Sequence, residues 1–387
     1  MTRSVGQVLV VGNGMFGAAA TRHLAERGND VTSVGAPSTR PDIRSSVDRR
    51  VASHTTYSSH NDAARLTRRQ DRNAVWAEVT EQAIGAYRAI EAASGIPFFH
   101  DVGCLIVSRP GGDGINGDPR QTMDETDVSY LAFEPGDPAW QTRWPRVSFP
   151  DTHYVAFEPA PAGFIRPKRL IAAQNVLAER AGAELLTDTV TKVERVGSVF
   201  QVETADGRSL KADRVLVAAG GFANFNDLLP APVAITLKSE VIVLGEVSET
   251  MAMELANFPT LKYLIDPGDI EGIYAVPPVQ YENGRYYLKL GANTRLDHHM
   301  TELSAIQKWF NTETDSEYLP LYEPVLRELW PSIEFLSVQT RPCLITYTAD
   351  HMPMIEHLGD GLFIATAGNG GGAKGSDAWG QRAADLL

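Results

Sequence analysis

The chain has 387 residues, of which 35 are basic and 48 acidic, and its formal net charge is −13 at pH 7. This length allows one large domain or a few ordinary ones, and 43% hydrophobic and 21% charged residues are typical of a globular protein. The acidic balance disfavours binding to nucleic acid or to an anionic membrane, which needs clustered Lys and Arg. Two cysteines exclude a disulfide framework and a four-cysteine zinc site. Apolar runs are too short for a signal peptide or a membrane span, so we expect a cytoplasmic protein.

The N-terminal residues follow the pattern of a dinucleotide-binding unit. Residues 8–11 read Val-Leu-Val-Val, which is typical of a strand buried on both faces of a parallel sheet. The pattern GNGMFG follows over 12–17, then a predicted helix over 18–27 and a second strand over 30–34. This order of strand, GxGxxG turn, helix and strand predicts a dinucleotide site. The alternative is a tight turn of small residues that binds no nucleotide.

The glycines of this turn each have a physical role in the prediction. Gly12 permits the tight turn, Gly14 lets the backbone approach a pyrophosphate, and Gly17 allows close packing of the helix. The helix N-terminus then presents N–H groups to the phosphates. The acidic residue that usually binds a ribose hydroxyl at the end of the second strand is absent, because Gly35 stands there. No arginine stands beside it to favour a 2′-phosphate, so we expect the ribose contact from elsewhere.

The remaining chain predicts further helices and strands. Amphipathic helices are expected over 73–93 and 167–181, and an acidic helix near 301–311. A long polar loop is expected over 36–58, and an exposed excursion rich in Gly, Asp and Pro over 109–126. Strands are expected over 183–186, 191–194, 200–204, 214–217, 241–244, 273–276, 286–290 and 361–367, with Asp206-Gly207 near the turn of a hairpin formed by 191–194 and 200–204.

This order of elements predicts an α/β fold, α+β overall, with a discontinuous Rossmann-like domain and a second domain built on a mixed or antiparallel sheet. The strands before Gly220 and Gly368 end in small residues and are expected to return to the first sheet. We therefore expect the nucleotide-binding domain to span 1–100, 160–228 and 340–387. The substrate-binding domain is expected to span 101–159 and 229–339.

An ordered set of motifs resembles one family of flavoenzymes. The set comprises GNGMFG at 12–17, SHNDAARLTR at 59–68, GFIRP at 163–167, ADRVLVAAGG at 212–221, YYLKLG at 286–291, RPCLITYTAD at 341–350, and a glycine loop over 368–372 before Lys374. Together they resemble the flavin-dependent amine oxidases of the D-amino-acid oxidase superfamily, most closely the monomeric sarcosine oxidase branch. The resemblance covers nearly the whole chain and implies that the cofactor is FAD rather than NAD.

The resemblance gives roles to two arginines of the 59–68 segment. It implies that Arg65 lies near the flavin ring and that Arg68 grips the carboxylate of the substrate. Arginine suits this role because its planar guanidinium binds a carboxylate with two parallel hydrogen bonds and stays charged. The alternative is a solvated basic face, since Arg69 and Arg72 follow closely.

Two lysines have implied roles as well. Lys374 follows a loop with four glycines, which lets backbone approach a ring without Cβ clashes. The resemblance implies that it binds the substrate carboxylate together with Arg68, although the loop is one residue shorter than the family pattern. Lys289 is implied to activate oxygen, because a nearby cation stabilises developing superoxide. The alternatives are an exposed lysine at a helix start for Lys374 and an exposed strand lysine for Lys289.

The resemblance also implies a covalently bound flavin. Cys343 matches the cysteine that forms a thioether to the flavin 8α-methyl group in sarcosine oxidase, and a thiolate is the right nucleophile for that addition. The alternative is a buried structural cysteine. Cys104 lies in an apolar strand and fits the structural alternative better. A covalent bond would also make the missing acid at Gly35 tolerable.

Three departures from the family pattern concern the substrate pocket. The family tyrosine over the substrate corresponds to Ala275, one residue after Tyr274, the histidine near the flavin to Asn293, and a threonine beside the first arginine to Ala64. Smaller residues predict a larger pocket, so we expect a substrate bulkier than sarcosine. The adjacent His298 and His299 would point to opposite faces of a strand, and no metal site is expected.

The expected site residues fall into three groups. Catalytic roles are expected for Lys289, Arg68, Lys374 and Arg65. Cofactor binding is expected for Gly12, Gly14, Met15, Phe16, Gly17, Ser59, His60, Arg65, Val190, Gly220, Cys343, Gly368, Gly370, Gly371, Gly372 and Lys374. Substrate binding is expected for Arg68, Tyr274, Ala275, Asn293 and Lys374.

The resemblance implies an FAD-dependent oxidase. It would oxidise the C–N bond of an amino acid, or of a secondary or cyclic amine with a carboxylate, to an imine, and O2 would become hydrogen peroxide. One alternative is a flavin-dependent 2-hydroxy-acid or amine dehydrogenase with another electron acceptor, and another is a flavin-binding subunit without turnover. An NADPH-dependent hydroxylase is disfavoured because the sequence has no second nucleotide fingerprint. We expect a monomer or homodimer.

Overall fold

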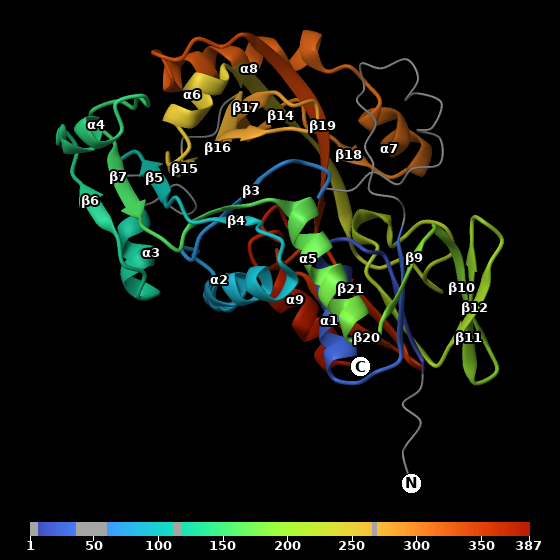
Figure 1. The fold of residues 1–387 in the computed structure, drawn as a ribbon. Helices are drawn as coiled ribbons and strands as arrows, with labels where there is room; N and C mark the ends of the chain where they lie inside the picture. The colour runs from blue at the N-terminus through green and yellow to red at the C-terminus, as the bar shows by residue number, and fades with distance from the viewer. Residues whose placement is uncertain (1–6, 36–59, 111–117, 265–268) are drawn as a thin grey trace.

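The computed structural model describes residues 7–35, 60–110, 118–264 and 269–387. Its elements form two large sheets and two small ones, with helices grouped against them (Figure 1). The predicted α/β class with a Rossmann-like unit is confirmed. The predicted boundaries between the two domains stay a prediction.

The first large sheet has six strands in the order β20-β21-β13-β1-β2-β9, all parallel except for the edge strand β20. Its central strands are apolar and buried on both faces, as a parallel sheet covered by helices requires. The sheet joins segments far apart in the chain, namely β1 (Val8–Val11), β2 (Val31–Gly35), β9 (Glu184–Thr187), β13 (Arg214–Val217), β20 (Met354–Gly359) and β21 (Leu362–Thr366).

Four helices gather beside this sheet: three of them contact its strands, and the helix over 74–94 packs on two of the others (Figure 1). They are α1 (Met15–Glu26), α2 (Ala74–Ser94), α5 (Pro167–Arg180) and α9 (Ser376–Asp385). Asn73 caps α2 by accepting hydrogen bonds from two backbone N–H groups of the first turn. A buried ion pair of 2.7 Å between Arg22 and Asp377 joins α1 to α9, so the C-terminal helix is fixed next to the nucleotide-binding turn.

The second large sheet has nine strands, in the order β18-β14-β17-β16-β15-β5-β7-β6, with β19 also paired to β14. Its strands are β5 (Cys104–Ser108), β6 (Leu131–Phe133), β7 (Tyr154–Glu158), β14 (Thr236–Val247), β15 (Thr260–Leu264), β16 (Ile270–Gln280), β17 (Tyr286–Thr294), β18 (His299–Met300) and β19 (Ser337–Tyr347). Helices α6 (Glu249–Glu254), α7 (Leu303–Phe310) and α8 (Asp315–Leu329) pack on it and enclose the largest apolar core. The short helices α3 (Pro119–Glu125) and α4 (Ala139–Arg143) lie near β5, β6 and β7 (Figure 1).

Two three-stranded sheets complete the fold. The first is formed by β10 (Val190–Val196), β11 (Val199–Thr204) and β12 (Ser209–Ala212). The second is formed by β3 (Arg65–Thr67), β8 (Gly163–Ile165) and β4 (Phe99–His100), and a short 3₁₀ turn, η4, covers Gly220–Phe222. Among the described helices, none is long and apolar enough to cross a membrane.

Most predicted helices and strands are confirmed within a few residues, and two local expectations are wrong. Asp206-Gly207 lies in the turn between β11 and β12, because Gly197 makes the turn between β10 and β11. The excursion over 109–126 includes helix α3, which buries Met123 in an apolar cluster. The loop predicted over 36–58 lies outside the described residues, and so does Ser59.

Candidate active site

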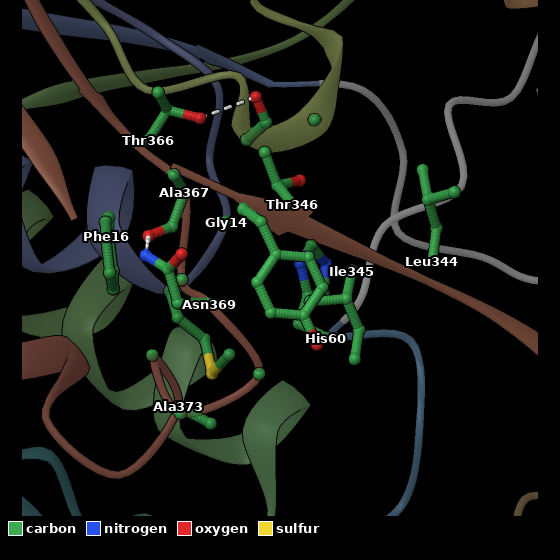
Figure 2. Close-up of a pocket in the computed structure, with 18 of the residues that line it drawn as sticks. Gly14, Phe16, His60, Leu344, Ile345, Thr346, Thr366, Ala367, Asn369 and Ala373 are labelled. Carbon is green, nitrogen blue, oxygen red and sulfur yellow. Dashed lines mark hydrogen bonds between the residues drawn. The ribbon is translucent and has the colours of Figure 1, made fainter. Parts of the chain in front are cut away.

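A cavity of about 1180 Å³ is lined by residues from both large sheets. It is larger than the roughly 300–1,000 Å³ of ordinary small-molecule pockets, as a site for a dinucleotide and a substrate together requires. Figure 2 shows how the β1–α1 turn, β19 and the C-terminal glycine loop meet around it. The site is thus assembled from segments at both ends of the chain.

The glycine turn forms one wall of the cavity. Residues 12–16 line it, and Gly12 has a left-handed backbone with φ +105°. A Cβ on Gly17 would overlap the carbonyl oxygen of Gly12, so Gly17 permits close packing and does not itself line the cavity. The buried Oδ1 atom of Asn13 has no hydrogen-bond partner among the described residues. The first residues of α1 line the cavity, and the start of a helix has unpaired backbone N–H groups of the kind that bind phosphate.

The structure gives a physical reason for the missing acid at the end of β2. A Cβ on Gly35 would lie 2.8 Å from the backbone nitrogen of Asn13, so a side chain there would collide with the glycine turn. Asp188, at the end of the neighbouring strand β9, lines the cavity and donates its backbone N–H to the Gly35 carbonyl at 3.0 Å. Its Oδ2 atom is buried and has no partner in the described part of the chain. The sequence analysis missed this carboxylate.

The C-terminal glycine loop forms another part of the cavity wall, with Gly372 next to the ring of Phe16. Gly368, Gly370, Gly371 and Gly372 all line the cavity. A Cβ on Gly372 would lie 2.7 Å from the Cα of Gly368, which explains why position 372 is a glycine. Asn369 donates its side-chain N–H to Ala367 (Figure 2) and its backbone N–H to Thr346 of β19, so the loop is tied to the second large sheet.

A buried ion-pair cluster lies beside the cavity. The ammonium of Lys289 donates to Asp62 at 2.6 Å and to the carbonyl of Ala64 at 2.7 Å, and Arg65 pairs with the same carboxylate. Burial alone would raise the pKa of Asp62, but the charges of Lys289 and Arg65 outweigh it and hold that pKa well below its usual range. Burial, then the charge of Arg65, lowers the pKa of Lys289 to about 8, while Asp62 opposes the shift.

Lys289 does not line the cavity, although Arg65 does. Its ammonium lies 5.1 Å from the ring centre of Tyr274, which does line it, so one aromatic ring lies between this cation and the open space. Arg65 contacts Cys343, with one guanidinium nitrogen 4.0 Å from the sulfur. The cluster therefore links Lys289, the 60–68 segment and Cys343.

The predicted carboxylate-binding residues Arg68 and Lys374 both line the cavity. The Nε of Arg68 donates to Gln70 at 3.2 Å, and no carboxylate of the described residues lies within ion-pair distance of it. Lys374 forms an ion pair with Asp71. Burial, then the charge of Arg68, lowers the pKa of Lys374 to about 8, while Asp71 opposes the shift. Arg68 is thus a cation open to an external anion.

Cys343 lines the cavity from β19, opposite Glu240 of β14 in the strand register. Directly paired residues of antiparallel strands point to the same face, and Glu240 lines the cavity as well. Burial raises the pKa of the Cys343 thiol, and burial raises the pKa of Glu240 to about 7. Cys104, by contrast, lies fully buried in an apolar cluster and does not line the cavity.

The structure corrects one expectation about the substrate pocket. Tyr274 faces the cavity, whereas Ala275 lies on the other face of β16, 2% exposed, in the apolar core. Successive residues of a strand point to opposite faces, so only one of the two can reach the site. Asn293 lines the cavity and accepts a hydrogen bond from Lys238. The small side chain at 275 therefore does not enlarge the pocket.

Most other expected site residues lie at the cavity. His60 lines it in a buried position, where burial, then the charges of Lys168 and Arg65, lowers its pKa to about 4. Val190 and Gly220 line it as well. Of the described expected residues, those that do not line it are Gly17, Lys289 and Ala275. Among the described residues, no cluster of three or more metal-binding side chains occurs.

Lining residues that the sequence analysis missed include Lys262, Glu240, Asp188, Asp71 and Trp76. A carboxylate or lysine inside an otherwise apolar strand was the signal available for Glu240 and Lys262, because such positions are expensive to bury without a function.

Comparison with known proteins decides the family. A family model described as FAD dependent oxidoreductase (DAO) matches residues 7–386. The chain belongs to this family of FAD-dependent oxidoreductases. The family assignment confirms the resemblance and establishes FAD as the cofactor, rather than NAD.

The individual proteins that resemble this chain share little sequence identity with it. A monomeric sarcosine oxidase from Streptomyces avermitilis is 26% identical over 218 residues, which are 56% of this chain, and the match spans about half the length of that relative (52%). The solved structure of NikD, described as an unusual amino acid oxidase essential for nikkomycin biosynthesis, has a TM-score of 0.75 at 21% identity and covers 98% of this chain and 93% of its own. Amadoriase I from Aspergillus fumigatus, a fructosyl amine:oxygen oxidoreductase, has a TM-score of 0.72 at 19% identity. The match covers 100% of this chain and 87% of the amadoriase chain. At these identities the structures show a shared fold.

The cavity fits the cofactor of the DAO family. Glycines at two walls leave room for a flat ring and for phosphates close to the backbone. The unpartnered buried oxygens of Asn13 and Asp188 lie where a nucleotide could supply hydrogen-bond donors.

Proposed function

We propose that this DAO-family protein is an oxidase of the C–N bond in an amino acid, or in a secondary or cyclic amine that carries a carboxylate. The product is an imine, and O2 accepts the electrons and becomes hydrogen peroxide. Cytoplasmic action stays a prediction from the sequence.

One observation carries this proposal: the guanidinium of Arg68 lines the cavity with a neutral hydrogen-bond partner, Gln70, and no carboxylate among the described residues pairs with it. A guanidinium in a cavity needs an anion to offset its desolvation. A substrate carboxylate supplies one with matching planar geometry. Lys374, held by Asp71 on the same cavity, adds a second cation for that carboxylate.

Bound FAD supplies the two-electron oxidation of the substrate. The residues of the chain would bind the cofactor and orient the substrate. The turn over 12–17, His60, Val190, Gly220 and the 368–372 loop would hold the cofactor, and Cys343 would attach it covalently. Arg68 and Lys374 would fix the substrate carboxylate, and so place the carbon that is oxidised at a single position. Tyr274 and Asn293 would bound the substrate from the second sheet.

In this proposal, Lys289 supplies a fixed positive charge that favours the reduction of O2. Its ammonium is held by Asp62 and Ala64, and it lies behind Tyr274. Transfer of one electron to O2 creates an anion, which a nearby fixed cation stabilises. The two hydrogen bonds keep this charge in place.

The test is a panel of matched compounds under anaerobic conditions. Proline and pipecolate would be compared with pyrrolidine and piperidine, which lack the carboxylate, and with 2-hydroxy acids. We expect loss of the oxidised flavin absorbance only with carboxylate-bearing amines, and hydrogen peroxide after air is admitted. Arg68→Met should raise KM about ten- to a hundredfold, the worth of a charged hydrogen bond.

Three other outcomes separate the alternatives. Reduction by 2-hydroxy acids alone would identify a hydroxy-acid dehydrogenase. Reduction by amines without peroxide formation in air would indicate a dehydrogenase with another electron acceptor. Bound flavin that no compound reduces, over a panel extended to acyclic N-alkyl amino acids and to amino acids with two carboxylates, would favour a binding subunit without turnover.

A further inference from the structure

The cavity contains a lysine that the proposed function does not use. Lys262 of β15 lines it from the nine-stranded sheet, whereas Arg68 follows β3 and Lys374 follows the C-terminal loop. The ammonium of Lys262 donates to the backbone carbonyl of Gly272 at 3.0 Å. No carboxylate in the described part of the chain lies within ion-pair distance of it. Lys262 and Arg68 are therefore two cations of one cavity that have only neutral hydrogen-bond partners.

The strand register places Lys262 on the wall that faces a ligand. Lys262 pairs directly with Tyr274 of β16, and both side chains line the cavity. The next pair along, Leu261 and Ala275, points the other way into the apolar core. The alternation of side chains along a strand thus fixes the ammonium toward the cavity, because a change of face would put a charge into the core.

Arg68 and Lys374 act on Lys262 from nearby, and no carboxylate of the described residues pairs with it directly. Burial, then the charge of Arg68, lowers the pKa of Lys262 to about 8. Glu240 opposes this shift, but it lies beyond ion-pair distance. A lysine that is desolvated beside an arginine is stabilised by an anion that binds to both or between them. The substrate carboxylate on Arg68 and Lys374 is one such anion, and with Lys262 the cavity has three cations, so that a second anion can bind there too.

We propose that Lys262 binds a second carboxylate of the substrate, so that the protein acts on an amino dicarboxylic acid. The inference rests on the proposed function, since it takes the first carboxylate to lie on Arg68 and Lys374. Lys262 then determines specificity: it selects against monocarboxylate amines, which would leave its charge without a counter-charge. The alternative is a structural role, in which Lys262 only holds β16 through the Gly272 carbonyl near the register shift after Glu271.

The test measures binding without turnover. The purified FAD-loaded protein would be titrated with succinate, glutarate and adipate, and with the monocarboxylates of equal chain length, butanoate, pentanoate and hexanoate. Binding is read from the change in the visible absorption spectrum of the flavin. We expect at least one dicarboxylate to bind about tenfold or more tightly than its monocarboxylate partner. Lys262→Met should abolish this preference and leave monocarboxylate binding within about threefold.

Two further variants separate specificity from structure. Lys262→Arg should keep the preference for the dicarboxylate, because it keeps the charge. Lys262→Glu should reverse it, so that 5-aminopentanoate binds more tightly than glutarate. A purely structural lysine predicts lower thermal stability in Lys262→Met with an unchanged preference, and that result would overturn the inference. If Lys262→Met fails to retain FAD, the Lys262→Arg and Lys262→Glu ratios decide the question.

Different outcomes of these titrations would refute the role of Lys262 and the proposed function. Equal binding of monocarboxylates and dicarboxylates, both weakened by Arg68→Met, would refute the role of Lys262 and keep the carboxylate site. No spectral response to any carboxylate, or a response that Arg68→Met leaves unchanged, would refute both.

Discussion

The ammonium of Lys289 lies 2.6 Å from a carboxylate oxygen of Asp62, with the two side chains 0% and 4% exposed. The two residues are separated by 227 positions in the chain. Asp62 also pairs with Arg65 and accepts a hydrogen bond from the hydroxyl of Tyr281 at 2.9 Å. The buried carboxylate of Asp62 therefore joins Arg65 of the 60–68 segment to Lys289 of the nine-stranded sheet.

Asp62→Asn should destabilise the protein strongly. It leaves Lys289 and Arg65 buried without their shared negative charge, and the loss of one partner of a buried pair costs about 3–5 kcal/mol. The measurement is the free energy of unfolding in urea. Glu254→Gln is the matched control, because Glu254 pairs with Arg146 at the exposed surface and its loss should change little. If both substitutions lower the free energy of unfolding by the same small amount, the prediction that Asp62 stabilises the buried cluster is wrong.

Lys289→Met should slow the reaction of reduced flavin with O2 about a hundredfold, as the loss of one charge-stabilising group does in other active sites. The flavin would be reduced with dithionite and mixed with oxygenated buffer in a stopped-flow instrument, so the result needs no substrate. The ammonium is present below a pH of about 8, to which burial lowers the pKa of Lys289, and is lost above it. The wild-type rate should therefore fall as pH rises through about 8, and the variant should lack this step. Lys192→Met, at the exposed surface, is the control.

Acid precipitation should leave the flavin colour with the protein, and mass spectrometry should find an FAD adduct on the peptide that contains Cys343. Cys343→Ala should release FAD in acid. Cys104→Ala should retain the adduct, because Cys104 lies in the core, where burial raises its pKa to about 12. Release of intact FAD from the wild-type protein would contradict the covalent bond and leave the fold unaffected.

Asp188→Ala should weaken FAD binding about tenfold in the Cys343→Ala background, where the cofactor is free to dissociate. The buried Oδ2 atom of Asp188 has no partner among the described residues and lies beside Gly35, where the usual ribose-binding acid is missing. Asp206→Ala, an exposed change in the adjoining turn, is the control. FAD affinity that is the same in both double variants would exclude Asp188 from the ribose site.

The sequence alone determined the parts of this protein that depend on neighbouring residues. The strand over 8–11, the glycine turn and the helix after it follow from local apolar runs and from the conformational freedom of glycine, and the structure confirms each of them. The same holds for the 73–93 helix, whose cap and apolar stripe lie within a few turns. The ordered motifs were sufficient to predict the family.

Tertiary structure decided which side chains meet. Tyr274 faces the cavity and Ala275 the core because the pairing of β15 and β16 sets which face of the strand points inward, and a shift of one residue would exchange them. Register shifts on β16 occur at two places in its pairing with β17, and residue spacing cannot locate them. The Asp62–Lys289 pair and the position of Lys262 depend on contacts between distant segments. Local periodicity carries no information on such contacts, because they form only when separate sheets pack together.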